Sequence, residues 1–193
     1  MFTEYKEWLT PEEHQEVLAE LLFRNRWRFG QVSDNTIEPS YPCWFQNYYH
    51  ISTREYDDET PETAKKLTER FKEQFVPEDY TLVRSMASSN TFAIDGDWHT
   101  DWPHPGVSIT GVLYTDRQWE RNWGGETLFV DEDGNMAASE YEPRKLITFD
   151  SSIPHIGKGP QRRCKEMRTI LAFQAVQTDV LEKRLNERLD SSK

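Results

Sequence analysis

The chain has 193 residues and a formal net charge of −11 at pH 7, and 36% of its residues are hydrophobic. This length and apolar content predict one structural domain with a buried core and exclude a disordered chain. The negative charge argues against unspecific binding to nucleic acid or to an anionic membrane, because both repel an acidic surface. We therefore expect neither as a partner.

The two cysteines, Cys43 and Cys164, are too few for a disulfide framework and are typical of a reducing compartment. The first residues, MFTEYKEWLTPEEHQ, lack the apolar run behind a basic start that marks a secretory signal. No segment approaches the length of a transmembrane helix. The expectation is a cytoplasmic protein, and nothing in the sequence predicts its oligomeric state.

Residues 1–79 are expected to form a helical support region packed on the rest of the domain. The segment TPEE at residues 10–13 is typical of a helix start, with a hydroxyl at the cap, proline next and then acids. The segment TPE at residues 60–62 repeats this signal. Apolar residues at helical spacing follow both starts, so two helices are predicted.

Residues 80–176 are predicted to form a β-core. Five short segments rich in β-branched and aromatic residues are separated by turns: YTLVRSMA, GVSITGVLYT, GETLFVDEDG, RKLITFD and MRTILAFQAV. Such regularly spaced strands indicate a sandwich or a small barrel. Residues 177–193 carry an amphipathic pattern and are expected to form a closing helix. The predicted fold class is mainly β with flanking helices (α+β).

The stretch WHTDWPH at residues 98–104 suggests a metal site. Side chains two residues apart on a strand point to the same face, so His99 and Asp101 can present a nitrogen and an oxygen together. His155 follows another predicted strand and is the best third ligand. His104 stands between two prolines and is expected in a loop near the mouth of the site, whereas His14 is expected as a solvated surface residue.

Two histidines and one carboxylate on one face of a metal leave positions open, as in non-haem Fe(II) oxygenases. A structural zinc site would be closed and would usually contain cysteine, and neither cysteine here lies in a C-x-x-C pattern. A catalytic zinc with the same three ligands remains an alternative by ligand type.

Arg168 is the candidate to bind an anion near this site. If a dicarboxylate occupied the open metal positions, a buried cation would have to hold its far end, and the planar fork of arginine suits a carboxylate. Arg168 opens the last predicted strand, where an inward position would be costly without an anionic partner. The alternative is a strand-end charge that points to solvent, as expected for Arg162 and Arg163 in the preceding loop.

The ordered set His99, Asp101, His155 and Arg168 resembles the Fe(II)/2-oxoglutarate-dependent dioxygenases, and most of all their prolyl-4-hydroxylase-like branch. The likeness covers about residues 86–174 and rests on WHTDWP, ITGVLYT, WGGETLF and PRKLITFDSSIPH followed by RTILAF. It implies a double-stranded β-helix, a jelly-roll and cupin-like core, with N-terminal helices bracing one sheet.

The resemblance also implies roles for individual residues. The two histidines and the aspartate would bind Fe(II), and Arg168 would hold the distal carboxylate of 2-oxoglutarate. Tyr114 matches a tyrosine whose hydroxyl helps to hold that carboxylate, although a core aromatic is the alternative. Thr110 and Val112 share its strand face and are expected to line the pocket. A further tyrosine common in protein-directed prolyl hydroxylases is missing here, near Ser89.

The implied reaction hydroxylates an unactivated C–H bond with O2 and yields succinate and CO2, with ascorbate as a candidate reductant. The substrate is either a peptidyl residue, proline by analogy, or a small molecule such as a free amino acid. A hypothesis of another class is a non-oxygenase metal-binding β-helix protein. Two segments are candidates for substrate contact: RNRWRFG, a basic patch with Arg24, Arg26 and Arg28, and YPCWFQNYYH, a wall or lid over the pocket.

Overall fold

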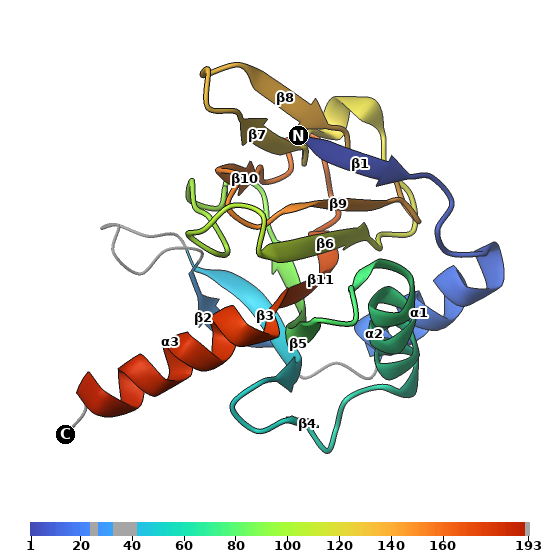
Figure 1. Ribbon diagram of the computed structural model, residues 1–193. Coiled ribbons are helices and arrows are strands. Elements are labelled where there is room, and N and C mark those ends of the chain that lie inside the picture. Colours follow the sequence, from blue (N-terminus) through green and yellow to red (C-terminus); the bar gives the residue numbers. More distant parts are fainter. Residues whose placement is uncertain (24–26, 33–41, 192–193) are drawn as a thin grey trace.

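The computed structural model describes residues 1–23, 27–32 and 42–191, and Figure 1 shows strands at the centre with helices around them. The helices are α1 (Pro11–Phe23), α2 (Glu62–Phe75), α3 (Thr178–Ser191) and the short 3-10 helix η1 (Arg121–Trp123). The strands are β1 (Phe2–Tyr5), β2 (Arg28–Gln31), β3 (Cys43–His50), β4 (Glu55–Tyr56), β5 (Tyr80–Asn90), β6 (Ser108–Tyr114), β7 (Thr127–Val130), β8 (Met136–Ser139), β9 (Leu146–Asp150), β10 (His155–Gly157) and β11 (Arg168–Gln177).

The strands form two antiparallel sheets. The major sheet has the order β1-β9-β6-β11-β5-β3-β2, with β4 paired to β3, and the minor sheet has the order β10-β7-β8. Apolar side chains of both sheets, among them Phe129 of β7, Phe149 of β9 and Ile170 of β11, form one buried cluster between them. Two sheets that share an inner core confirm the predicted fold class, mainly β with flanking helices.

Helices α1 and α2 cover the other face of the major sheet, as Figure 1 shows. The predicted apolar stripe of α2 is buried: Leu67 and Phe71 pack against Leu171 and Phe173 of β11. The rings of Phe71 and Phe173 stack with centroids 4.8 Å apart. Leu171 and Phe173 therefore face the helices. Because neighbouring side chains of a strand point to opposite faces, Ile170 points to the inner side, between the two sheets.

The start of α1 follows the sequence pattern closely. The backbone N–H of Glu13 donates to Thr10 Oγ1 (3.2 Å), and the Thr10 N–H donates to Glu13 Oε2 (2.9 Å), which is a capping box. The expectation of a solvated His14 is wrong, because this residue is only 5% exposed. Its Nε2 lies 2.9 Å from the carbonyl oxygen of Thr115, so the ring donates to the chain just after β6.

Residues 1–79 contribute strands as well as the two predicted helices. β1 pairs with β9 at one edge of the major sheet, and β3 pairs with β5 near the other edge. The aromatic run YPCWFQNYYH, of which Tyr41 lies outside the described residues, is therefore largely strand β3. Its Tyr48 is 2% exposed and joins the core beneath the helices.

The third predicted helix is also present as α3. Leu181 of this helix packs against Val176 of β11 and Trp102 in a small buried cluster. In the described ranges, none of the helices is both long enough and apolar enough to cross a membrane.

The contact between α2 and β6 requires the absence of a side chain at Gly111. A Cβ at this position would stand 2.9 Å from Phe71 Cζ, and Phe71 is fully buried. We expect Gly111→Ala to lower the free energy of unfolding by about 1–3 kcal/mol through overpacking, as measured by urea denaturation. The double variant Gly111→Ala/Phe71→Leu should lose less than the two single losses combined; additive losses would contradict the proposed contact.

Candidate metal centre and adjoining pocket

His99 and His155 lie side by side because their backbones form an isolated antiparallel bridge. The N–H of His99 donates to the carbonyl of His155 (3.1 Å), and the N–H of His155 donates back (2.9 Å). His155 is the first residue of β10, which pairs with β7 in the minor sheet. Asp101 follows His99 by two residues, and the next N–H, that of Trp102, donates to Ser151. Backbone contacts thus fix the segments carrying all three side chains.

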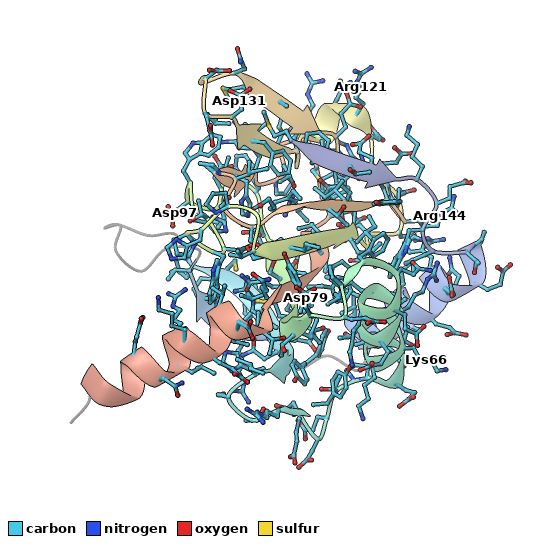
Figure 2. All side chains as sticks on the ribbon, viewed as in Figure 1. Lys66, Asp79, Asp97, Arg121, Asp131 and Arg144 are labelled. Carbon is cyan, nitrogen blue, oxygen red and sulfur yellow. The ribbon has the colours of Figure 1, made fainter. Side chains whose placement is uncertain are left out.

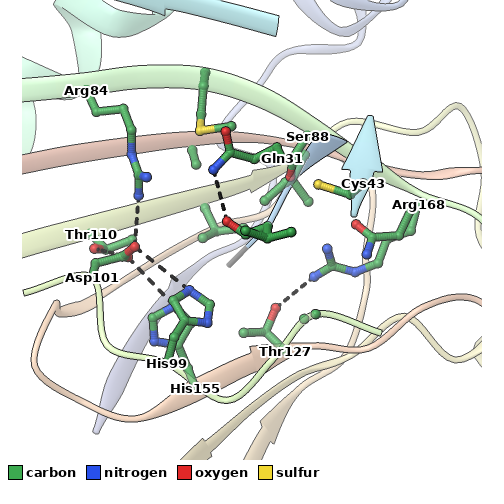
Figure 3. Close-up of a pocket in the computed structure, with 18 residues that line it drawn as sticks. Gln31, Cys43, Arg84, Ser88, His99, Asp101, Thr110, Thr127, His155 and Arg168 are labelled. Atoms are coloured by element: carbon green, nitrogen blue, oxygen red, sulfur yellow. Dashed lines mark hydrogen bonds and ion pairs between the residues drawn. The ribbon is translucent and has the colours of Figure 1, made fainter. Parts of the chain in front are cut away.

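The ligand atoms of His99, Asp101 and His155 converge. One such atom from each residue lies within 4.8 Å of the others. His99 Nε2 is 3.9 Å from Asp101 Oδ1, and His155 Nε2 is 3.7 Å from Asp101 Oδ2. Figure 3 shows the two imidazoles and the carboxylate turned toward one another at one end of a pocket. The structure therefore brings together the three residues that the sequence proposes as ligands.

The outer nitrogens of both imidazoles face backbone carbonyls. His99 Nδ1 lies 2.7 Å from Asp97 O, and His155 Nδ1 lies 2.9 Å from Ile153 O. A carbonyl can only accept, so each Nδ1 carries a proton and donates. In the neutral ring this leaves the Nε2 lone pair directed at the cluster, which is the arrangement that metal-binding histidines use.

The charge states of the cluster also suit a divalent metal. Burial lowers the pKa of His155 to about 4, so this ring is neutral at neutral pH. Burial alone would raise the pKa of Asp101, but the Arg84 guanidinium, with smaller contributions from His155, His99 and the Thr110 hydroxyl, outweighs it and holds that pKa well below its usual range. Arg84 Nη2 donates to Asp101 Oδ1 (2.8 Å) and Thr110 Oγ1 donates to Oδ2 (2.7 Å). The donor set is thus two nitrogens and one ionised carboxylate.

Arg168 lies in the same pocket and is buried, with 2% exposure, so the alternative of a charge pointing to solvent is wrong. Its Nε donates to the carbonyl of Gly125 (2.7 Å) and its Nη2 donates to Thr127 Oγ1 (3.0 Å). A Cβ on Gly157 would stand 3.1 Å from Nη1, so the guanidinium occupies space that this glycine leaves open. Within the described residues, no carboxylate lies within 4.0 Å of it.

The remaining predicted pocket residues divide into two groups. Thr110 and Val112 line the pocket, as expected for one face of β6. Tyr114, on the same face, is fully buried and lies behind Thr127, to whose Oγ1 its hydroxyl donates (2.9 Å). The pocket lining contains Thr127 and not Tyr114. Any influence of Tyr114 on a ligand would therefore pass through Thr127 and Arg168.

The pocket encloses about 130 Å³ between the cluster and Arg168. A water molecule in the liquid occupies roughly 30 Å³, so this space suits a small organic molecule. Sequence reasoning missed three of its polar lining residues, Arg84, Asn90 and Thr127. The signal for Arg84 and Asn90 was their even spacing with Met86 along β5, which sends them to one face.

Other expected candidates lie outside the pocket lining. His104 is exposed in a bend after the cluster, and His50 is exposed at the end of β3, where its Nδ1 contacts Ser52. Of the basic patch, Arg24 and Arg26 lie outside the described residues, and Arg28 is exposed at the start of β2. Of residues 42–50, the described part of the aromatic run, only Cys43 lines the pocket.

Behind Arg168, a buried carboxyl group completes the surroundings of the guanidinium. The Thr169 N–H donates to Asp116 Oδ2 (2.8 Å), and the Tyr141 hydroxyl donates to the same oxygen. The Arg168 guanidinium lies 5.7 Å from the centre of the Tyr141 ring. Burial nevertheless raises the pKa of Asp116 to about 7.

Comparison with known proteins gives matches by structure alone. No family model and no curated protein matches the sequence. A prolyl hydroxylase from Trichoplax adhaerens, solved with a hypoxia-inducible-factor peptide, has a TM-score of 0.70 at 16% identity over 92% of this chain and 84% of that chain. A Pseudomonas putida prolyl-4-hydroxylase has a TM-score of 0.65 at 15% identity over 91% of both chains.

The non-haem α-ketoglutarate-dependent epimerase SnoN from nogalamycin biosynthesis is also similar, with a TM-score of 0.65 at 11% identity over 91% of this chain and 78% of that chain. These likenesses confirm the jelly-roll fold. They also confirm, at the level of the fold, the resemblance that the sequence motifs carry.

The raised pKa of Asp116 predicts a pH dependence of stability. Folded Asp116 keeps its proton up to about pH 7, whereas the unfolded chain loses it near 3.8. The stabilisation that this proton gives to the folded state is complete below the unfolded pKa, and it is lost as the pH rises through the folded pKa. We expect Asp116→Asn to flatten the fall in unfolding free energy between about pH 4 and pH 7, measured by urea denaturation.

The exposed Asp58 supplies the matched control, because Asp58→Asn should follow the wild-type curve. Parallel curves for wild type and Asp116→Asn would show that this carboxyl does not titrate in that range.

Proposed function

We propose that this chain is an Fe(II)- and 2-oxoglutarate-dependent dioxygenase that hydroxylates an unactivated C–H bond, with succinate and CO2 as co-products. One observation carries the proposal: a single pocket is lined at one end by His99, Asp101 and His155 and at the other by the buried Arg168. Three ligands on one face leave metal positions open, and a buried guanidinium calls for an anionic partner. The fold similarity to 2-oxoglutarate oxygenases supports the same conclusion.

The three ligand side chains would hold the iron, which when bound would supply the activation of O2 that side chains cannot provide. The chain's own contribution is to position the donors. Backbone carbonyls orient both imidazoles, and the hydrogen bonds from Thr110 and Arg84 fix the Asp101 carboxylate. Hydrogen bonds of this kind, behind the donor atoms, orient metal ligands.

Arg168 would bind the distal carboxylate of 2-oxoglutarate. The hydrogen bonds to Gly125 and Thr127 hold the guanidinium in place, and the Tyr114 hydroxyl orients Thr127 from behind. Thr110 and Val112 would form part of the wall along the co-substrate. Burial of this charge makes the pocket selective for anions, because a neutral ligand would leave the guanidinium without compensation.

The prime substrate belongs to one of two classes. A peptidyl residue, proline by analogy, is supported by the likeness to prolyl hydroxylases, one of them solved with a peptide. A small molecule such as a free amino acid is supported by the likeness to SnoN, an epimerase from nogalamycin biosynthesis. The alternative of another class, a non-oxygenase metal-binding protein, would produce no succinate.

The proposal includes O2 as the second co-substrate and ascorbate as a candidate reductant. It also treats the chain as one structural domain, because β1 and β3 from the N-terminal region lie within the same major sheet as the later strands. A reducing, cytoplasmic location accords with the two free thiols, Cys43 and Cys164.

Removal of one ligand tests the metal site. We expect His155→Ala to weaken Mn(II) binding, measured without oxygen, by more than about 100-fold, because one of three donors is lost. Succinate formation with Fe(II), 2-oxoglutarate and O2 should disappear as well. The exposed His104 provides the control, since His104→Ala removes the same side chain outside the pocket lining. Equal Mn(II) binding by wild type and His155→Ala would refute the metal assignment.

Replacement of the buried arginine tests the co-substrate assignment separately. Arg168→Leu should raise the 2-oxoglutarate concentration needed for half-saturation by about 100-fold, because two charge-assisted hydrogen bonds are lost. Mn(II) binding should be retained, since Arg168 is not a ligand. Arg163→Leu changes an exposed arginine of the preceding loop and should behave as wild type. An unchanged 2-oxoglutarate requirement in Arg168→Leu would overturn this role.

A further inference from the structure

A second arginine lines the pocket at the end opposite Arg168. Arg84 lies on β5 with Met86, Ser88 and Asn90, and these four alternate residues share the inner face of the strand. Figure 3 shows the Arg84 guanidinium next to Asp101 and the Arg168 guanidinium farther along the same pocket, next to Thr127. Arg84 is therefore held at the Asp101 end of the pocket, whereas Arg168 is held at the Thr127 end.

The guanidinium of Arg84 is only partly used by the protein. Its Nη2 donates to Asp101 Oδ1 (2.8 Å), and its side chain is 30% exposed. The Nε atom is buried and lacks a hydrogen-bond partner within the part of the chain that the structure describes. Arginine has five N–H donors in a fixed fork, so most of the binding capacity of Arg84 remains available to a ligand.

The charges of the pocket lining favour an anion. Among the arginines, lysines and carboxylates of the described lining, Arg84 and Arg168 are positive and Asp101 is the single carboxylate. The lining thus carries one excess positive charge in a chain whose net charge is −11. Charged side chains such as Lys66 and Arg121 lie on the outside of the molecule and do not line this pocket (Figure 2).

Occupation of the proposed iron and 2-oxoglutarate sites would leave this excess unchanged. A divalent metal and the dianionic co-substrate cancel in charge, and Arg168 faces the co-substrate. The metal would share the Asp101 carboxylate, which is the one acidic partner of Arg84 that the structure describes. Arg84 would then be a partly buried cation that shares its one described acidic partner with the metal, and a buried charge with incomplete compensation is costly.

We propose that Arg84 is a specificity-determining residue that binds a carboxylate of the prime substrate. This inference rests on the proposed function and narrows its substrate class to molecules with a free carboxylate close to the C–H bond that reacts. A free amino acid meets this description, and so does a peptide whose terminal carboxylate lies next to the reacting residue. An internal peptidyl residue, whose backbone carbonyls are neutral, does not.

The test measures carboxylate preference without turnover. Protein saturated with Mn(II) and 2-oxoglutarate under nitrogen is titrated calorimetrically with free amino acids and, in parallel, with their amides. A second arm uses tripeptides with free or amidated C-termini and separates the two sources of the carboxylate. We expect at least one acid to bind about tenfold more tightly than its amide, the gain typical of a hydrogen bond to a charged group.

Variants assign the preference to Arg84. The ratio of acid to amide affinity should fall to about one in Arg84→Met and should be partly kept in Arg84→Lys, which retains the charge but not the fork. Arg121→Met removes an equal charge from a surface ion pair with Glu140 and should leave the ratio unchanged.

The outcomes separate this inference from the proposed function. Failure of the wild type to bind 2-oxoglutarate with Mn(II) would refute the proposed function itself. Normal 2-oxoglutarate binding without any acid preference in the wild type would refute only the role of Arg84. A preference that persists undiminished in Arg84→Met would refute it as well.

Discussion

The alternation of side chains along β5, β6 and β11 is the constraint on which the rest of the structure depends. These adjacent strands occupy the middle of the major sheet, and each presents one face to the helices and one to the pocket. Leu171 and Phe173 bury the outer face under α2, while Ile170 and Ala172 line the pocket. Because the period is two, helix packing on one face fixes which side chains reach the other. The pocket is thus built on strands whose other face is packed against the helices.

The pocket contains several charged side chains, among them Asp101 and Arg168, at buried positions where a charge is costly. Hydrogen bonds from neighbouring groups offset this cost. Hydrogen bonds from Arg84 and Thr110 keep Asp101 ionised, and carbonyl acceptors hold the imidazoles of His99 and His155. A buried network of polar groups stabilises a protein only when each hydrogen-bond donor has an acceptor and each acceptor has a donor. The same hydrogen bonds would hold the three ligand side chains in position for a metal. They would therefore serve both the stability of the pocket and the proposed chemistry.

The two arginines give the pocket two separate cationic positions. Arg168 is fully enclosed and backed by Thr127, Tyr141 and the Asp116 carboxyl, which suits a co-substrate that every turnover requires. Arg84 is closer to solvent, with part of its side chain exposed. The acidic surface outside would repel anions at long range, so selectivity for them would arise only within the pocket.

The sequence by itself determined the mainly β fold class, the three helices and the positions of the candidate ligands. The spacing of apolar residues, helical in the helices and alternate in the strands, shows which side of each segment is buried. The capping box at Thr10 and Glu13 depends on two residues only three positions apart. The spacing of His99 and Asp101 likewise needs only the geometry of one extended segment. These features could be predicted because each depends on residues close together in the chain.

Only the tertiary structure decided how distant segments meet. It placed β3 beside β5, buried His14 against the end of β6, set Tyr114 behind Thr127 and brought Arg84 to Asp101. These contacts join segments that are far apart in the sequence, and the pairing of β3 with β5 also has a register in which a shift of one residue would turn the same side chains to the opposite face. Periodicity specifies that a side chain points inward, whereas strand pairing determines which group it meets there.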